Sequence, residues 1–135
     1  MGQPLGQAER VLFAAVALLT GVVGVAMFFF PVFGGQRLWP WLLTPLVSRF
    51  LGALFIAVAV GAVFAARTRY WQEVRALFPP ALTFTGLALI ASLLYLPSFK
   101  HPILERLYFL VYVVVFVAGL VVYLRYERRL PTAPP

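Results

Sequence analysis

Cysteine and aspartate are absent from this 135-residue chain, and histidine and lysine each occur once. Without cysteine there is no disulfide framework, thiolate metal site or cysteine nucleophile. His101 lies in a short predicted loop and has no second ligand at metal-binding spacing. The four acidic residues are the glutamates Glu9, Glu73, Glu105 and Glu127. No nucleophile–base pair or paired carboxylates can be assembled from these groups, so the sequence predicts a chain that is not an enzyme on its own.

Apolar residues dominate instead. They make up 63% of the chain, and charged residues only 11%. A soluble domain has about 45–50% apolar and about 25% charged residues, and a protein of this size could not hide so much apolar surface from water. The net charge of +7 comes from basic residues at the ends of apolar runs. That distribution predicts a protein of the lipid bilayer and argues against a nucleic-acid partner.

Four uncharged or nearly uncharged segments account for most of the chain: Val11–Phe30, Leu46–Ala66, Ala81–Leu96 and Leu107–Leu124. They have about the length of membrane helices and no period of two, and backbone groups in lipid must bond within their own segment. We therefore expect an all-α fold, a polytopic membrane four-helix bundle in a single domain over residues 1–130. The spans are expected at about 10–30, 45–66, 79–97 and 103–125.

Two shorter segments have other compositions. Residues 71–78 are amphipathic and basic, which predicts a short interfacial helix before the third span. The proline-rich residues 131–135 predict a disordered tail.

The basic residues also predict orientation. Four of them fall on one side of the predicted spans: Arg37, Arg49, Lys100 and Arg106. Seven fall on the side of the two termini: Arg10, Arg67, Arg69, Arg75, Arg125, Arg128 and Arg129. Since basic loops stay in the cytoplasm, we expect both termini there, with the chain in the inner membrane of a bacterium.

Small residues recur every four positions along the first two spans, with Ala17 before Gly21 and Thr20 before Gly24 in the first. The predicted packing residues are Gly21 and Gly24 in the first span, and Ala53, Ala57, Gly61 and Ala65 in the second. Small residues at this spacing let membrane helices approach closely. They predict a tight hairpin of the first two spans, unless the spacing arises by chance in alanine-rich helices.

Three charged residues lie within the first two turns of the second and fourth predicted spans. If Pro45 and Pro102 stand in first turns, then Arg49, Glu105 and Arg106 lie at similar depths, about 5–6 Å below the helix starts. Charges inside a membrane usually face the bundle interior and pair, so Arg49 and Glu105 predict a salt bridge. Two interpretations remain open. The arginines extend outward to headgroups or form a structural bridge, or they line a cavity that holds an anionic headgroup, a quinone carbonyl or a partner's carboxylate.

Aromatic residues gather near the span ends. Trp39, Trp41 and Trp71 are predicted interface anchors. The helical stripe Tyr108, Phe109, Tyr112 and Phe116 predicts core or lipid packing, with stacking against a flat cofactor as the alternative. We expect no resident cofactor, while contact with a quinone, lipid or pigment stays open.

The stretch LWPWLLTPLVSRFLGA, followed by FAARTRYW, resembles small uncharacterised four-helix bacterial membrane proteins that are loosely DoxX-like. The resemblance covers mainly residues 37–71, with Trp39-Pro40-Trp41, Pro45, Arg49 and Gly52 as its motif. It implies the four-span layout. The broader group includes subunits linked to quinone-coupled oxidation, but this chain has neither cysteine nor a histidine within a predicted helix.

Three functions follow as expectations. The first is a non-catalytic small integral membrane protein, an accessory or scaffold subunit that packs against other membrane subunits or against itself. The alternative is a binder or carrier of a lipid, quinone or anion, with a polar site near the outer leaflet. The weaker alternative, from the resemblance, is a subunit of a quinone-linked electron-transfer enzyme.

Overall fold

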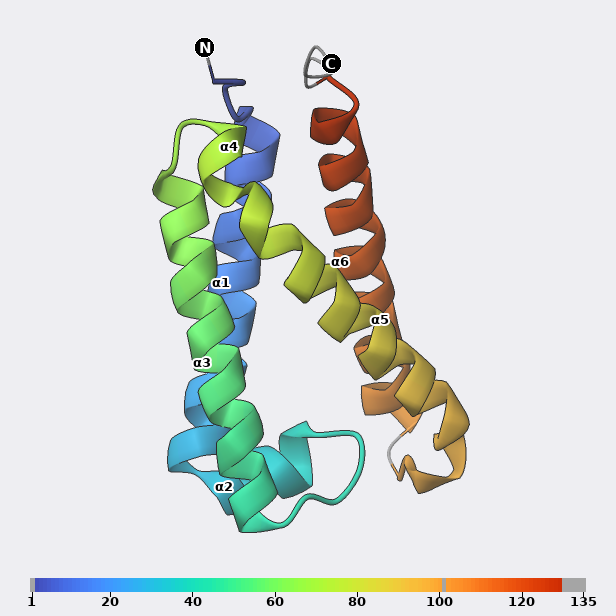
Figure 1. The fold of residues 1–135 in the computed structure, drawn as a ribbon. Helices are drawn as coiled ribbons and strands as arrows, with labels where there is room; N and C mark the ends of the chain where they lie inside the picture. The colour runs from blue at the N-terminus through green and yellow to red at the C-terminus, as the bar shows by residue number, and fades with distance from the viewer. Residues whose placement is uncertain (1, 101, 130–135) are drawn as a thin grey trace.

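The computed structural model describes residues 2–100 and 102–129 (Figure 1). Four helical segments are long and apolar enough to cross a membrane: α1 (Gln7–Phe29), α3 (Pro45–Arg67), the segment Trp71–Leu94, and α6 (Pro102–Glu127). The predicted all-α fold with four spans is confirmed, and the architecture is that of a multi-pass membrane protein. The predicted disordered tail and the loop histidine His101 lie outside the described residues.

Local sequence signals explain where the helices begin. Thr44 caps α3, because its Oγ1 accepts a hydrogen bond from the Val47 N–H at 3.3 Å. Pro45 follows in the first turn, where its missing N–H costs nothing. The third span contains α5 (Phe78–Leu94), which likewise carries prolines in its first turn. These boundaries need no tertiary contact.

The helices pair as two hairpins, α1 with α3 and α5 with α6 (Figure 1). α5 runs obliquely from the α1–α3 hairpin to the start of α6. We call the end that holds residues 2–6, 68–75 and 125–129 the terminal end. The opposite end, the loop end, holds α2 (Pro31–Phe33), η1 (Gly34–Leu38, a turn of π-helix) and η3 (Leu96–Ser98, a 3₁₀ turn).

The α1–α3 hairpin is tight because two glycines meet. A Cβ at Gly52 would lie 2.6 Å from the Phe28 nitrogen and 2.8 Å from the Gly24 oxygen. A Cβ at Gly24 would lie 2.9 Å from the Gly52 oxygen. All of these neighbours are backbone atoms, so neither helix can yield by turning a side chain. Only glycine at both positions permits this approach.

A hydrogen bond between the two helices lies one turn away. The Met27 carbonyl would normally accept from the N–H four residues on, but that residue is Pro31, which has no N–H. The fully buried Ser48 replaces the missing donor, and its Oγ donates to the Met27 oxygen at 3.0 Å. An unpaired carbonyl inside a membrane is costly, so this bond couples the end of α1 to the start of α3.

The α3 face that packs against α1 differs from the predicted one. Ala65 is buried, but Ala53 and Ala57 are exposed, and a Cβ at Gly61 would meet no atom within 4 Å. The buried positions of α3 are Ser48, Gly52, Phe55, Ala59 and Ala65. α3 carries two overlapping series of small residues. The series with Ser48 and Gly52 forms the contact because it offers both a glycine backbone and a hydroxyl donor.

On α1 the two predicted packing glycines do face α3. Gly24 is buried at the closest approach, and a Cβ at Gly21 would lie 3.6 Å from the Cβ of Ala59, an ordinary van der Waals contact. The hairpin therefore narrows at Gly24 and keeps a normal separation one turn nearer the terminal end.

The α5–α6 hairpin is looser. A Cβ at Gly86 would lie 3.3 Å from the Phe116 ring, and one at Gly119 would lie 3.3 Å from the Leu82 side chain. These contacts involve side chains rather than backbone. In the apolar 18-residue windows of the segment Trp71–Leu94 and of α6 only 11% of residues are buried, against 22% in α3. Most of this hairpin's apolar surface thus lies outside the protein's own core.

Two clusters of buried residues join the hairpins. The terminal cluster consists of Leu5, Phe13, Ala65, Trp71, Val74, Phe78 and Tyr126. The loop-end cluster consists of Met27, Trp39, Leu43, Phe55 and Tyr108, with Trp41, Phe99, Phe109 and Tyr112 partly buried around it. Both clusters are rich in aromatic rings, whose edge-to-face and stacked contacts fill the space between helices that diverge.

The segment predicted as an interfacial helix, 71–78, is helical. α4 (Trp71–Val74) and η2 (Arg75–Leu77) continue directly into α5. Trp71 is fully buried and Val74 almost so, both within the terminal cluster. The apolar side of this segment is therefore covered by protein, not by lipid.

Candidate functional site

The structure does not bring the predicted charged group together. Arg49 and Arg106 are exposed, and Glu105 is half-buried. Within the described residues the ion pairs are Arg75–Glu127 and Arg125–Glu9, neither of which involves Arg49 or Glu105. The expected Arg49–Glu105 bridge is absent from the described part of the chain.

Rotation about the helix axis explains the difference. The prediction matched the two residues by depth, and depth says nothing about the direction a side chain takes. Ser48 and Gly52 turn toward α1, and Arg49, one residue after Ser48, leaves the helix about 100° away from that face. α3 pairs with α1, whereas α6 pairs with α5. Arg49 and Glu105 therefore belong to different hairpins.

The tryptophans predicted as interface anchors lie at the span ends but inside the protein. Trp71 is fully buried, Trp39 is 6% exposed, and Trp41 is half-buried. The Trp39 ring contacts Trp41 and Tyr108 edge to face, with centroids 5.1 and 5.6 Å apart. Trp39 and Trp71 therefore pack the ends of the bundle with their rings covered by protein, and the role of the three tryptophans as interface anchors stays a prediction. Composition alone does not distinguish the two roles.

The polar atoms that most resemble a binding site lie in and around the loop-end cluster. Ser92 Oγ and the Tyr108 hydroxyl lie 3.0 Å apart, and the Tyr108 and Tyr112 rings stack with centroids 4.3 Å apart. The buried indole N–H of Trp39 has no hydrogen-bond partner among the described residues. An unpaired buried donor is rare and calls for an explanation. Such a donor suits an aromatic face or the acceptor atom of a bound molecule.

At the terminal end, Glu127 holds α4 against α6. Its Oε1 accepts from the Trp71 indole N–H at 3.0 Å, and its Oε2 accepts from Arg75 Nη2 at 3.3 Å. The Arg75 side chain is about half exposed, so the ion pair contributes little by itself. The bond to the buried indole gives the carboxylate a structural role.

A second ion pair joins α1 to α6. Glu9 is buried in the first turn of α1, and its Oε1 lies 3.6 Å from Nη1 of Arg125 in the last turn of α6. Each charge suits the dipole of its own helix. The Arg125 side chain stays 56% exposed. Its guanidinium has five N–H donors, so it retains donors for a second acidic group.

The N-terminal segment completes the terminal end. Leu5 N donates to the Arg69 oxygen, and Trp71 N donates to the Gln3 oxygen, both at 2.9 Å. The Tyr126 hydroxyl accepts from Gly6 N at 3.2 Å. These bonds tie the residues before α1 to the α3–α4 loop and to α6, so the terminal end is the more firmly connected of the two.

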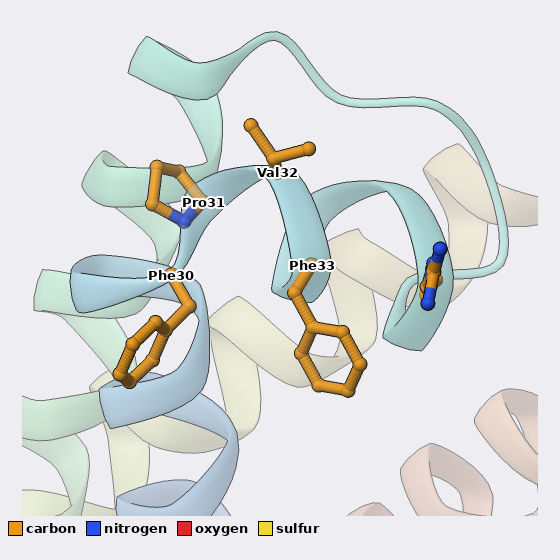
Figure 2. Close-up of a pocket in the computed structure, with 5 residues that line it drawn as sticks. Phe30, Pro31, Val32 and Phe33 are labelled. Atoms are coloured by element: carbon orange, nitrogen blue, oxygen red, sulfur yellow. The ribbon is translucent and has the colours of Figure 1, made fainter.

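The surface of residues 2–100 and 102–129 includes two hollows that bear on function. Figure 2 shows the first, on α2 and η1, with the Phe30 and Phe33 rings turned to one side. It has a volume of about 430 Å³ and is lined by Phe30, Pro31, Val32, Phe33 and Arg37. The second is a groove of about 300 Å³ between α1 and α6. Its lining consists only of Leu12, Ala15, Val16, Leu19, Leu110, Val111, Val114 and Val115.

The sequence-based predictions missed three of these polar residues. Ser48 could have been found from Pro31, which leaves the Met27 carbonyl without a donor. Glu9 and Glu127 could have been found as the acidic residues in the first turn of α1 and at the end of α6. Within residues 2–100 and 102–129, no three His, Cys, Asp or Glu side chains converge as metal ligands would.

No protein-family model, curated protein or solved structure matches the chain. The DoxX-like resemblance therefore stays a prediction.

Proposed function

We propose that this chain is a non-catalytic small integral membrane protein that serves as an accessory or scaffold subunit of a larger membrane complex. The outward face of α6 carries the proposal. Seven exposed aliphatic residues follow one another along it at alternating steps of four and three: Ile103, Leu107, Leu110, Val114, Val117, Val121 and Leu124. This heptad spacing suits knobs-into-holes packing against another helix.

The aromatic residues of α6 support the same proposal. All six, from Tyr108 to Tyr126, are buried or half-buried, so the aliphatic face is the one left for a partner. The buried polar groups hold the fold together: Glu127 binds Trp71, Glu9 pairs with Arg125, and Ser48 satisfies a carbonyl. Because these polar groups are already engaged in structural hydrogen bonds and an ion pair, they favour the role of a scaffold over that of a catalyst.

Purification in a mild detergent tests the proposal, with two variants of equal size. Val121→Trp places a large ring on the heptad face, and Val22→Trp places the same ring on α1; the two positions are 58% and 63% exposed. We expect the wild-type chain and Val22→Trp to migrate at a mass well above the 15.0 kDa monomer, with defined membrane subunits or further copies of the chain in a fixed ratio. Val121→Trp should migrate alone. A wild-type monomer, or an intact assembly in Val121→Trp, overturns the proposal.

We further propose a bacterial inner-membrane location with both termini in the cytoplasm, supported by the seven arginines at the terminal end. Because the chain has no cysteine, single substitutions report orientation cleanly. A membrane-impermeant maleimide should label Gln36→Cys, at the exposed loop end, on intact cells. Gln72→Cys, exposed at the terminal end, should be labelled only after permeabilisation. The reverse pattern rejects this orientation.

A second candidate function is supported by Trp39. Its unpaired indole N–H, surrounded by aromatic rings, suits the carbonyl of a small flat molecule such as a quinone, as in a binder or a subunit of a quinone-linked enzyme. Calorimetric titration with a short-chain quinone tests this candidate. Loss of one hydrogen bond predicts about tenfold weaker binding in Trp39→Phe, with Trp41→Phe close to wild type. Equal affinity in both variants, or no binding to the wild-type chain, rejects it.

A further inference from the structure

The groove between α1 and α6 is lined by the half of α1 nearer the terminal end and by the middle of α6, and it contains no polar side chain. Its α1 lining, Leu12 to Leu19, covers about 10 Å of helix at 1.5 Å per residue. Phe13 of the terminal cluster and Tyr112 of the loop-end cluster lie at the level of the groove on α1 and α6, respectively, and beside them the two helices leave this space unfilled by the protein's own side chains. A polar ligand would gain no hydrogen bond from the lining, so the occupant at this depth is hydrocarbon.

The volume of the groove suits a single hydrocarbon chain. A methylene group takes about the volume of a water molecule, about 30 Å³, so a groove of about 300 Å³ holds roughly ten of them. One extended acyl chain therefore fits along the groove.

Two charged residues, Glu9 and Arg125, lie beyond the groove toward the terminal end. Arg125 stands fourteen residues, or almost four turns, after Val111, so both lie on one face of α6. Glu9 stands three residues before Leu12 on the corresponding face of α1, and the Glu9–Arg125 pair joins the two helices there. From the end of the groove at Val115 to Arg125 is about 15 Å along the helix, which is about half the bilayer's hydrocarbon thickness.

The terminal end is also basic as a whole. Its seven arginines face three glutamates among the described residues, Glu9, Glu73 and Glu127. Arg128 and Arg129 are exposed in the turn after Arg125. A guanidinium with unused donors suits a phosphate, which it can contact through two parallel hydrogen bonds. Such a surface attracts anionic lipids over zwitterionic ones.

We infer that the α1–α6 groove holds one acyl chain of an anionic phospholipid from the leaflet at the terminal end, with the lipid phosphate on Arg125. The hydrocarbon chain fills the space between the two hairpins, and the headgroup lies beside the Glu9–Arg125 pair. The groove shares its lining residues Leu110 and Val114 with the heptad face of α6, so the acyl chain would border the helix that the proposed function places there. The two proposals fail separately, because the lipid test uses the wild-type chain and substitutions on α1 and at Arg125, whereas the subunit test uses Val121→Trp.

Native mass spectrometry of the detergent-solubilised full chain tests the inference directly. Dioleoyl phosphatidylglycerol and dioleoyl phosphatidylcholine have the same acyl chains and differ in headgroup charge. We expect one phosphatidylglycerol per chain, bound at least tenfold more tightly than phosphatidylcholine. Equal affinity for the two lipids overturns the role of the phosphate site. A chain that binds neither lipid, or that forms a lipid-free dimer, overturns the lipid assignment altogether.

Two neighbouring alanines give a matched pair for the groove. Ala15 lines it and Ala14 does not, and both are exposed. Ala15→Phe should abolish the one-to-one lipid species, while Ala14→Phe should bind as wild type does. Equal binding by the two variants overturns the groove assignment. Circular dichroism checks that both fold, and the comparison of the two lipids on the wild-type chain needs no variant.

The headgroup contact has its own pair of variants. Arg125→Gln should reduce the preference for phosphatidylglycerol at least fivefold, and Arg125→Lys should retain most of it. A preference unchanged in Arg125→Gln removes this arginine from the site.

Discussion

Replacing Gly52 with alanine should force α1 and α3 apart. The new Cβ would lie 2.6 Å from the Phe28 nitrogen, whereas ordinary contacts begin at 3.4 Å. The helices must therefore separate by about 0.8 Å at this point, against backbone atoms that cannot rotate away. Overpacking of this kind costs about 1–3 kcal/mol. The same movement lengthens the Ser48–Met27 hydrogen bond, which lies one turn away.

Gly61→Ala is the control, since Gly61 lies on the same helix and a Cβ there meets no atom within 4 Å. Both variants gain about 1 kcal/mol of helix propensity. Their difference therefore isolates the steric term, and we expect Gly52→Ala to be about 1–3 kcal/mol less stable than Gly61→Ala.

Unfolding in dodecyl maltoside micelles by increasing dodecyl sulfate, followed by circular dichroism, measures the difference. If the two variants unfold together, Gly52 does not lie at the close contact. If Gly61→Ala is the less stable variant, the face predicted from the sequence, with Ala53 and Ala57, is the true one.

Three further substitutions test other contacts by the same unfolding measurement. Ser48→Ala leaves the Met27 carbonyl without a donor and should cost about 1–3 kcal/mol; no loss would show that another group satisfies it. Arg49→Ala and Arg37→Ala should differ by less than about 0.5 kcal/mol, because both side chains are exposed; a larger loss for Arg49→Ala would restore the buried salt bridge. Trp71→Phe removes a buried donor and should cost about 1–3 kcal/mol, more than Glu127→Gln, and the opposite order would contradict the role given to the indole.

The sequence predicts the helices well because their signals are local. Thr44 and Pro45 start a helix by themselves, and the apolar runs have the length that a membrane requires. Neither signal depends on how the helices later assemble, so the number and approximate extent of the spans follow from the sequence.

The direction in which each helix faces does not follow in the same way. α3 offers two series of small residues, and the choice between them depends on Gly24 and the Met27 carbonyl, which belong to another helix. For the same reason, equal depth did not pair Arg49 with Glu105. Since almost every residue of these spans is apolar, hydrophobicity cannot indicate which side is buried.

The Ser48–Met27 bond has a consequence for how the chain enters the membrane. While α1 is synthesised alone, its Met27 carbonyl has no donor, because Pro31 cannot supply one. Ser48, which supplies the donor, is synthesised 21 residues later, at the start of α3. We therefore expect the first span to be stably inserted only once the second has been synthesised, so that the two integrate together. Separating them during synthesis, for example with a long insertion at the exposed Leu42, should delay stable integration of the first span.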